Sequence, residues 1–124
     1  MSETQTQTQN TTQNQSTTKV ENIAIRFETR PEVHHVFASN GYAYTSAIVH
    51  VKSYIIINNR EFEFDGAFVS RDFYIENTEQ DVEAFIKKVA ESKKTMIDNI
   101  NKFLKLREKL LTELKQYGEV EEYF

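Results

Sequence analysis

The chain has 124 residues, 39% of them hydrophobic, and a formal net charge of -4 at pH 7. This length suits one domain and leaves little room for a second. There is no cysteine, which excludes a disulfide framework and a thiolate metal site. No apolar run approaches the roughly 20 residues of a membrane-spanning helix, and the first residues lack the basic and apolar regions of a secretory signal. We therefore expect a cytoplasmic protein without membrane association.

The N-terminal segment is polar and nearly uncharged. Residues 2–18 read SETQTQTQNTTQNQSTT, with Glu3 as the only charged residue. A segment with so little apolar surface cannot offset the entropy that is lost when a chain is ordered. We therefore expect residues 1–19 to form a disordered tail and a single folded domain to span residues 20–118.

Residues 20–76 show the period-two pattern of β-strands. Ile23, Ile25 and Phe27 share one face of the first predicted strand. Residues that favour turns or breaks then divide the segment, namely Arg30-Pro31, Ser39-Asn40-Gly41, Asn58-Asn59 and Asp65-Gly66. These boundaries predict an antiparallel meander of about five strands, a type of sheet that can keep one face in water.

Residues 78–117 carry the pattern of a long amphipathic helix. Asn77 or Thr78 suits its N-cap, with Gln80 or Asp81 at the third helical position, and Gly118 suits its end. A straight helix over residues 79–117 would be about 58 Å long, whereas a compact domain of this size is about 30 Å across. We therefore expect the helix either to break at the polar residues 91–95 and form a hairpin, or to protrude into a partner.

The expected fold is thus α+β, an antiparallel sheet followed by a long helix or helical hairpin. Apolar residues recur along the helix with heptad spacing, which favours pairing with a second copy of the chain, although packing on the chain's own sheet would use the same residues. The predicted homodimer interface consists of Met96, Ile100, Phe103, Leu110 and Leu114. A neighbouring row, Ile97, Leu104 and Leu111, would cover the sheet.

One face of the predicted sheet combines aromatic rings with cations. Rings stack on unpaired bases and cations hold phosphates, so this composition is typical of single-stranded nucleic-acid binders. The predicted nucleic-acid-binding residues are Arg26, Tyr42, Tyr44, His50, Lys52 and Tyr54. Aromatic residues are also ordinary strand residues, and residues 19–75 hold six Lys or Arg against seven Asp or Glu.

Few residues could support catalysis or metal binding. Glu61, Glu63 and Asp65 alternate onto one face and could hold Mg²⁺ in a nuclease, with Lys52 as a nearby cation, but no positioned base accompanies them. His34 and His35 are adjacent in a strand and must point to opposite faces. We expect no catalytic residue, no metal and no cofactor.

The C-terminal residues 119–124 are acidic and end in two aromatic residues. This segment resembles the acidic, Phe-ending tip of bacterial single-stranded-DNA-binding proteins, which recruits replication and repair enzymes. The resemblance implies that Glu121, Glu122, Tyr123 and Phe124 bind a protein partner. The alternative is a terminus that folds onto its own domain.

The whole layout of polar tail, sheet, long helix and acidic aromatic tip is similar to that of the small single-stranded-DNA-binding proteins of crenarchaeal rod-shaped viruses, which lack the OB fold and are dimers. It also resembles the sheet-then-helix plan of PC4-like and Whirly-like binders. The resemblance implies a dimeric, non-enzymatic single-stranded-DNA-binding protein, located in the host cytoplasm if it is viral. A second reading is a protein-interaction or inhibitor module, such as a viral protein that binds a host protein; a metal-dependent nuclease is a minor third.

Overall fold

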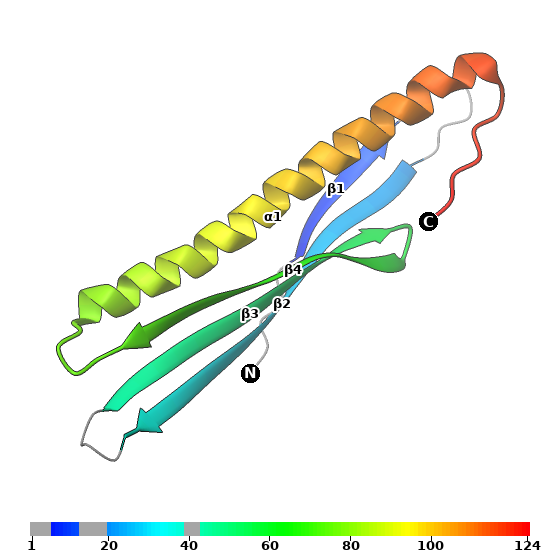
Figure 1. Ribbon diagram of the computed structural model, residues 1–124. Coiled ribbons are helices and arrows are strands. Elements are labelled where there is room, and N and C mark those ends of the chain that lie inside the picture. Colours follow the sequence, from blue (N-terminus) through cyan, green and yellow to red (C-terminus); the bar gives the residue numbers. More distant parts are fainter. Residues whose placement is uncertain (1–5, 13–19, 39–42) are drawn as a thin grey trace.

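The computed structural model of the protein describes residues 6–12, 20–38 and 43–124. Its elements are β1 (Thr6–Thr12), β2 (Val20–Phe37), β3 (Ala43–Ile57), β4 (Arg60–Phe73), α1 (Glu79–Leu114) and the 3-10 turn η1 (Lys115–Tyr117). The strands form one antiparallel sheet in chain order, and α1 lies along one face of it (Figure 1). The fold is α+β, with three long antiparallel strands followed by one long helix and with the short β1 beside β2.

The expectation of about five strands is wrong, and Pro31 gives the first reason. It lies inside the continuous strand β2, where it pairs with Val49 of β3. Among the described residues, β1 pairs with β2 as far as Arg26, so the described neighbour of Pro31 is β3 alone. A proline is tolerated in a strand where its missing N–H faces away from the neighbouring strand.

Asp65-Gly66 is the second expected boundary that lies inside a strand. The pairing of β3 with β4 shifts by one residue between Ser53 and Tyr54, which is a β-bulge. The unpaired residue is Phe64 of β4, and directly after it the backbone N–H of Gly66 donates a 2.8 Å hydrogen bond to the carboxylate of Asp65. The pair bends β4 instead of ending it.

Two other turn predictions have different outcomes. Asn58-Asn59 does connect β3 to β4, and both residues have positive φ angles, 49° and 68°, as a tight hairpin turn requires. Ser39-Asn40-Gly41 lies outside the described residues, although Phe37 and Ala43 on either side of it pair with each other. The predicted tail, residues 1–19, contains β1; its remaining residues also lie outside the described part.

α1 is a single helix, so of the two predicted alternatives the long helix is confirmed and the hairpin with a break at residues 91–95 is wrong. At 1.5 Å per residue its 36 residues span about 54 Å, and at 3.3 Å per residue the 15 residues of β3 span about 50 Å. The helix has no need to fold back or protrude because the sheet is equally long. Within the polar residues 91–95, the Lys93 amine lies 6.0 Å from the ring centroid of Phe27 and so stays over the sheet.

The core lies between α1 and the part of the sheet that is formed by the start of β2 and the end of β3. Its buried residues are Ile23, Ile25 and Phe27 of β2, Val51, Ile55 and Ile57 of β3, and Met96, Ile100 and Leu104 of α1. This corrects part of the predicted dimer interface. Met96 is 2% exposed and Ile100 is 0% exposed, because the long sheet of the same chain already covers this part of the predicted interface. Phe103, Leu110 and Leu114 remain exposed.

The helix crosses the sheet diagonally. Near its start, Phe85 meets Phe73 at the end of β4 with ring centroids 5.9 Å apart; near its end, Arg107 is paired with Glu21 at the start of β2. Figure 1 shows this oblique crossing. A diagonal helix leaves two corners of the sheet uncovered. One lies beside the start of β4, and the other lies where β2 ends and β3 begins.

Candidate binding surfaces

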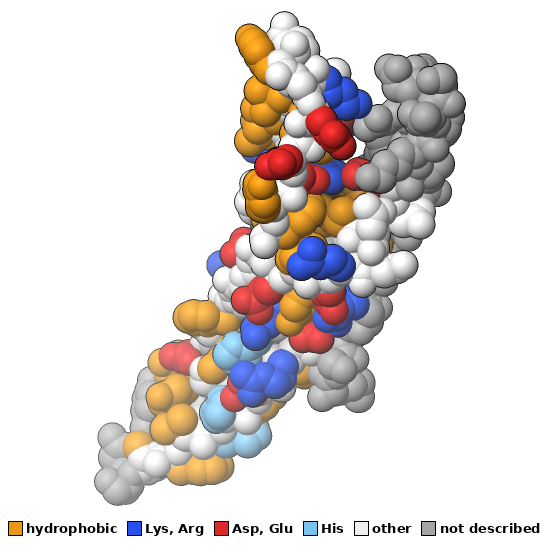
Figure 2. Space-filling model, turned by 90° about the vertical axis from the view of Figure 1, so that its right-hand side faces the viewer, with side chains coloured by type: hydrophobic (Ala, Val, Ile, Leu, Met, Phe, Trp, Pro, Cys, Tyr) orange, Lys and Arg blue, Asp and Glu red, His pale blue; other side chains and the backbone are white. Residues whose placement is uncertain are grey.

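The face of the sheet opposite α1 carries the predicted aromatic and basic residues. Along β3, Lys52 and Tyr54 alternate with Val51, Ser53 and Ile55, which are buried on the helix side. Tyr44 and His50 are an even number of residues from Lys52 in the same strand, so their side chains belong to the face of the sheet opposite α1, the open face. In Figure 2, basic and acidic side chains alternate beside the histidines, and no large patch of one charge is seen.

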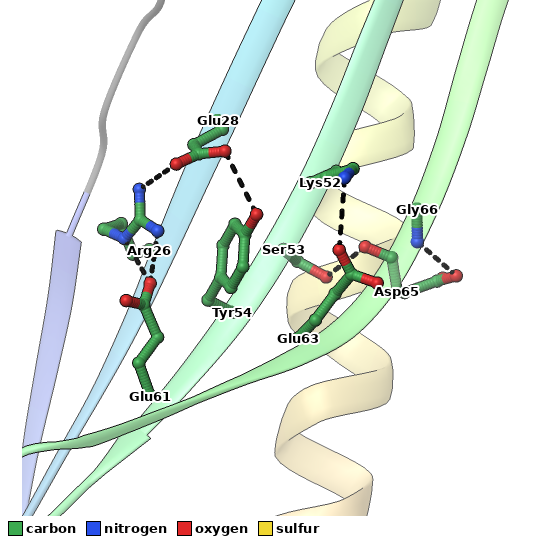
Figure 3. A network of polar contacts seen from close by, with 9 residues as sticks. All are labelled: Arg26, Glu28, Lys52, Ser53, Tyr54, Glu61, Glu63, Asp65 and Gly66. Atoms are coloured by element: carbon green, nitrogen blue, oxygen red, sulfur yellow. Dashed lines mark hydrogen bonds and ion pairs between the residues drawn. The ribbon is translucent and has the colours of Figure 1, made fainter.

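Arg26 and Tyr54 belong to one polar network (Figure 3). Arg26 donates to Glu28 at 2.8 Å and to Glu61 at 2.6 Å, and the Tyr54 hydroxyl donates to Glu28 at 3.0 Å. The Arg26 guanidinium carbon lies 4.3 Å from the Tyr54 ring centroid, which is a cation–π distance. The hydrogen bond from Arg26 lowers the pKa of Glu28. One face of Tyr54 is therefore covered by a cation that two carboxylates already neutralise.

Further charged residues of this face are also paired. Lys52 lies 3.3 Å from Glu63. The carboxylate of Glu32 is 2.6 Å from His50, 3.1 Å from His34 and 3.3 Å from Arg30. The hydrogen bonds with His34, first, and with His50 lower the pKa of Glu32, and the charge of Arg30 acts in the same direction.

The predicted nucleic-acid contacts are thus brought to one face, but they are engaged within the chain. Tyr44 lies against Tyr74, with ring centroids 5.6 Å apart, and Tyr42 lies outside the described residues. Among the described residues of this face, the cations Arg26, Arg30 and Lys52 are matched by four carboxylates, Glu28, Glu32, Glu61 and Glu63. A strand of nucleic acid would have to compete with each of these pairs for its phosphate contacts.

The carboxylates considered for Mg²⁺ serve separate partners. Glu61 binds Arg26, Glu63 binds Lys52, and Asp65 accepts from its neighbour's backbone. The His35 ring is hydrogen-bonded to the Thr45 hydroxyl at 2.9 Å, and the His34 ring is hydrogen-bonded to the Glu32 carboxylate. The two histidines thus lie on opposite faces, as strand alternation requires. In residues 6–12, 20–38 and 43–124, no group of three or more His, Cys, Asp or Glu side chains could hold a metal ion.

The C-terminal segment lies on its own domain. Arg107, whose side chain is only 8% exposed, donates to Glu122 at 2.6 and 2.8 Å and to Glu21 with two further 2.8 Å bonds. These hydrogen bonds, that of Glu21 first, raise the pKa of Arg107. Arg107 is seven residues after Ile100 and so lies on the side of the helix that faces the sheet. In the structure it connects the start of β2, the helix and the C-terminal segment.

Aromatic rings complete this contact. Phe124 stacks on Phe62 with ring centroids 5.0 Å apart, and the Arg60 guanidinium lies 5.1 Å and 5.8 Å from the two centroids. We call this corner of the molecule the C-terminal groove; it is lined by Ile55, Ile57, Phe62, Phe64 and Phe103 and leaves a space of about 320 Å³. Of the four predicted partner-binding residues, Glu122 and Phe124 hold the tail in place, while Glu121 accepts from the Tyr123 hydroxyl at 2.6 Å.

A second apolar surface runs along the flank of α1. We call it the helix stripe: Phe103, Leu106, Leu110, Leu114 and Tyr117, which are between 37% and 81% exposed. Their spacing of three or four residues places them on one side of the helix. Phe103 also lines the C-terminal groove, with its ring centroid 5.9 Å from that of Phe64, so the two surfaces are continuous.

Comparison with known proteins does not assign the chain to a family. No protein-family model matches it, and neither a curated protein nor a solved structure shows significant similarity to it. Within the described residues, no helix combines the length and the apolarity that crossing a membrane requires.

Proposed function

We propose that the chain is a non-enzymatic protein-interaction module that acts as a homodimer, with the helix stripe as the surface that joins the two copies. The observation that carries this proposal is the row of five large apolar side chains on one flank of α1, each of which is at least 37% exposed in the described part of the chain. Contiguous apolar surface of this kind marks protein–protein contact sites. The heptad-like spacing suits a second helix laid alongside.

The paired charges of the open sheet face also favour a protein ligand over nucleic acid. An excess of positive potential is the usual footprint of a nucleic-acid site. Arg26 and Lys52 do not provide such an excess, because both are paired with carboxylates. A polar, charge-balanced face is compatible with the rim of a protein interface. In this proposal the stripe joins the two copies, and each copy presents its open sheet face to a partner protein.

Sedimentation velocity of wild type and of Leu106→Glu/Leu110→Glu tests the dimer. Two buried carboxylates at the centre of the interface should weaken the dimer at least 100-fold, because each charge would lose its solvation. Since both side chains are exposed in the single copy, the monomer fold should survive. Lys102→Glu/Lys105→Glu, also two exposed positions of α1, is the matched control and should leave the dimer intact. A wild-type monomer at high micromolar concentration would overturn the proposal.

A second candidate is single-stranded nucleic-acid binding by the open sheet face. It is favoured by the placement of Tyr44, His50, Lys52 and Tyr54 on one face of one strand. Fluorescence anisotropy with labelled oligonucleotides at two salt concentrations tests it. Binding that weakens with salt and falls at least tenfold in Tyr44→Ala/Lys52→Ala, but not in the exposed helix variant Lys87→Ala/Lys88→Ala, would support it. Absence of binding at low salt would reject it.

A further inference from the structure

We propose that the C-terminal groove binds the C-terminal segment of a second copy of the chain, so that two copies exchange residues 119–124. This inference rests on the proposed homodimer, and it adds a site to which each copy contributes residues. The groove supplies Phe62, the neighbouring Arg60 and Arg107 supply their guanidinium groups, and the partner supplies Glu122 and Phe124.

The chemistry of the groove matches the segment that lies in it. Arg107 forms two hydrogen bonds with Glu122, and Arg60 lies over both rings of the Phe62–Phe124 stack. An acidic segment ending in an aromatic residue is therefore the ligand that this site recognises. Every copy of the chain carries that ligand, so a second copy offers the same contacts from outside.

The chain's own segment fills the groove incompletely. Phe124 remains 57% exposed and Tyr123 83% exposed, although both are large aromatic residues and an apolar space of about 320 Å³ lies beside them. A second copy that packs on the helix stripe would approach through Phe103, which belongs to both surfaces. Its arrival would cover these rings and close the space.

The connection to the segment permits exchange. Gly118 has a φ of 134°, and a glycine can adopt both positive and negative φ, so a change at this residue can send residues 119–124 in another direction. A short link holds its ligand at a millimolar effective concentration. In a dimer joined by the stripe, the partner's segment would be held at a similar concentration, so exchange keeps the same contacts at little cost, as in other swapped dimers.

Cross-linking of Glu63→Cys/Tyr123→Cys separates the two arrangements, because both residues line the groove, the Phe62–Phe124 stack stays intact and the chain has no other cysteine. With a short bismaleimide, exchange predicts a covalent dimer as the main product in denaturing electrophoresis. A segment that stays on its own copy predicts an internally looped monomer, and this result would overturn the proposal. The two single-cysteine variants are the controls and should give little covalent dimer.

Wild-type protein provides a measurement without substitutions. In a 1:1 mixture of ¹³C-labelled and unlabelled chains, isotope-filtered NMR should detect contacts between the Phe124 ring of one copy and the Phe62 ring of the other. A dimer in sedimentation that lacks these intermolecular contacts overturns tail exchange and leaves the proposed function intact. A monomer in sedimentation overturns both.

Discussion

At the scale of single residues, Arg107 connects more of the molecule than any pattern in the sequence indicated. Its guanidinium binds Glu21, which is 86 positions away in the chain, and Glu122, which is 15 positions away. It is nearly buried, and each of its two carboxylate partners is less than one third exposed. A buried charge depends on its partners, because the cost of removing it from water has already been incurred.

Arg107→Ala should lower the free energy of unfolding by about 3 kcal/mol, because it leaves two carboxylates side by side without their cation. Urea denaturation followed by circular dichroism measures this loss. Lys105→Ala, two positions earlier and exposed, is the matched control and should change stability by no more than about 0.5 kcal/mol. If Arg107→Ala were as mild as its control, the pairs would contribute nothing to the fold.

The residue scale also shows where prediction from sequence ended. Alternation was sufficient to place His50, Lys52 and Tyr54 on one face. Which carboxylate meets which cation was not predictable, because Arg26 finds Glu61 only through the register of β2, β3 and β4. A set of residues that looked available for nucleic acid in the sequence is therefore engaged in the folded chain.

At the scale of elements, the start of α1 is held by a compact polar contact. The Asp81 carboxylate accepts from the Thr78 backbone N–H at 2.7 Å and from its hydroxyl at 3.1 Å, and Arg71 donates to it at 2.9 Å. These bonds, the Thr78 backbone bond first, lower the pKa of Asp81 from an ordinary 3.8 to about 2. The contact links the helix start to β4.

Acid should weaken the start of α1. Because the folded-state pKa of Asp81 lies below its unfolded value, its stabilising contribution is complete above pH 3.8 and is lost as the pH falls toward 2. Asp81→Asn should thus be less stable than wild type at pH 6, and the difference should shrink between pH 4 and pH 2. Thermal melts across this range measure it, with the exposed Asp98→Asn as control. A difference that stays constant with pH would exclude this role for the carboxylate.

The same scale explains which elements could be foreseen. The sequence predicted that α1 starts after Asn77 or Thr78, because capping chemistry is local. The structure uses Thr78 as the N-cap and Asp81 as the third residue. The continuity of β2 through Pro31 and of β4 through Gly66 was missed because it depends on which neighbour each strand has and on a bulge in β4. The expected helical break rested on a compact shape, and the length of the sheet removes that requirement.

At the scale of the whole molecule, stability is concentrated along one diagonal of the sheet. Met96, Ile100 and Leu104 pack on both β2 and β3, whereas the first turns of α1 rest chiefly on Phe85 against Phe73 and on the Arg71–Asp81 pair. Val82 and Ile86 line an apolar groove of about 570 Å³ at the far ends of β2 and β3. Local opening should therefore begin at the helix start, since regions with few buried apolar contacts open at the lowest free energy.

Ile100→Ala and Ile86→Ala form a matched pair that measures this imbalance. Ile100 is fully buried and Ile86 is 57% exposed, although both are isoleucines of the same helix. Removing the Ile100 side chain should cost about 3 kcal/mol through lost burial and the cavity left behind, whereas Ile86→Ala should cost no more than about 0.5 kcal/mol. Native-state hydrogen exchange should show earlier opening of residues 79–90 than of residues 96–107. If Ile86→Ala lowered the free energy of unfolding as much as the expected loss for Ile100→Ala, another surface, such as that of a second copy, would have to cover Ile86 in solution.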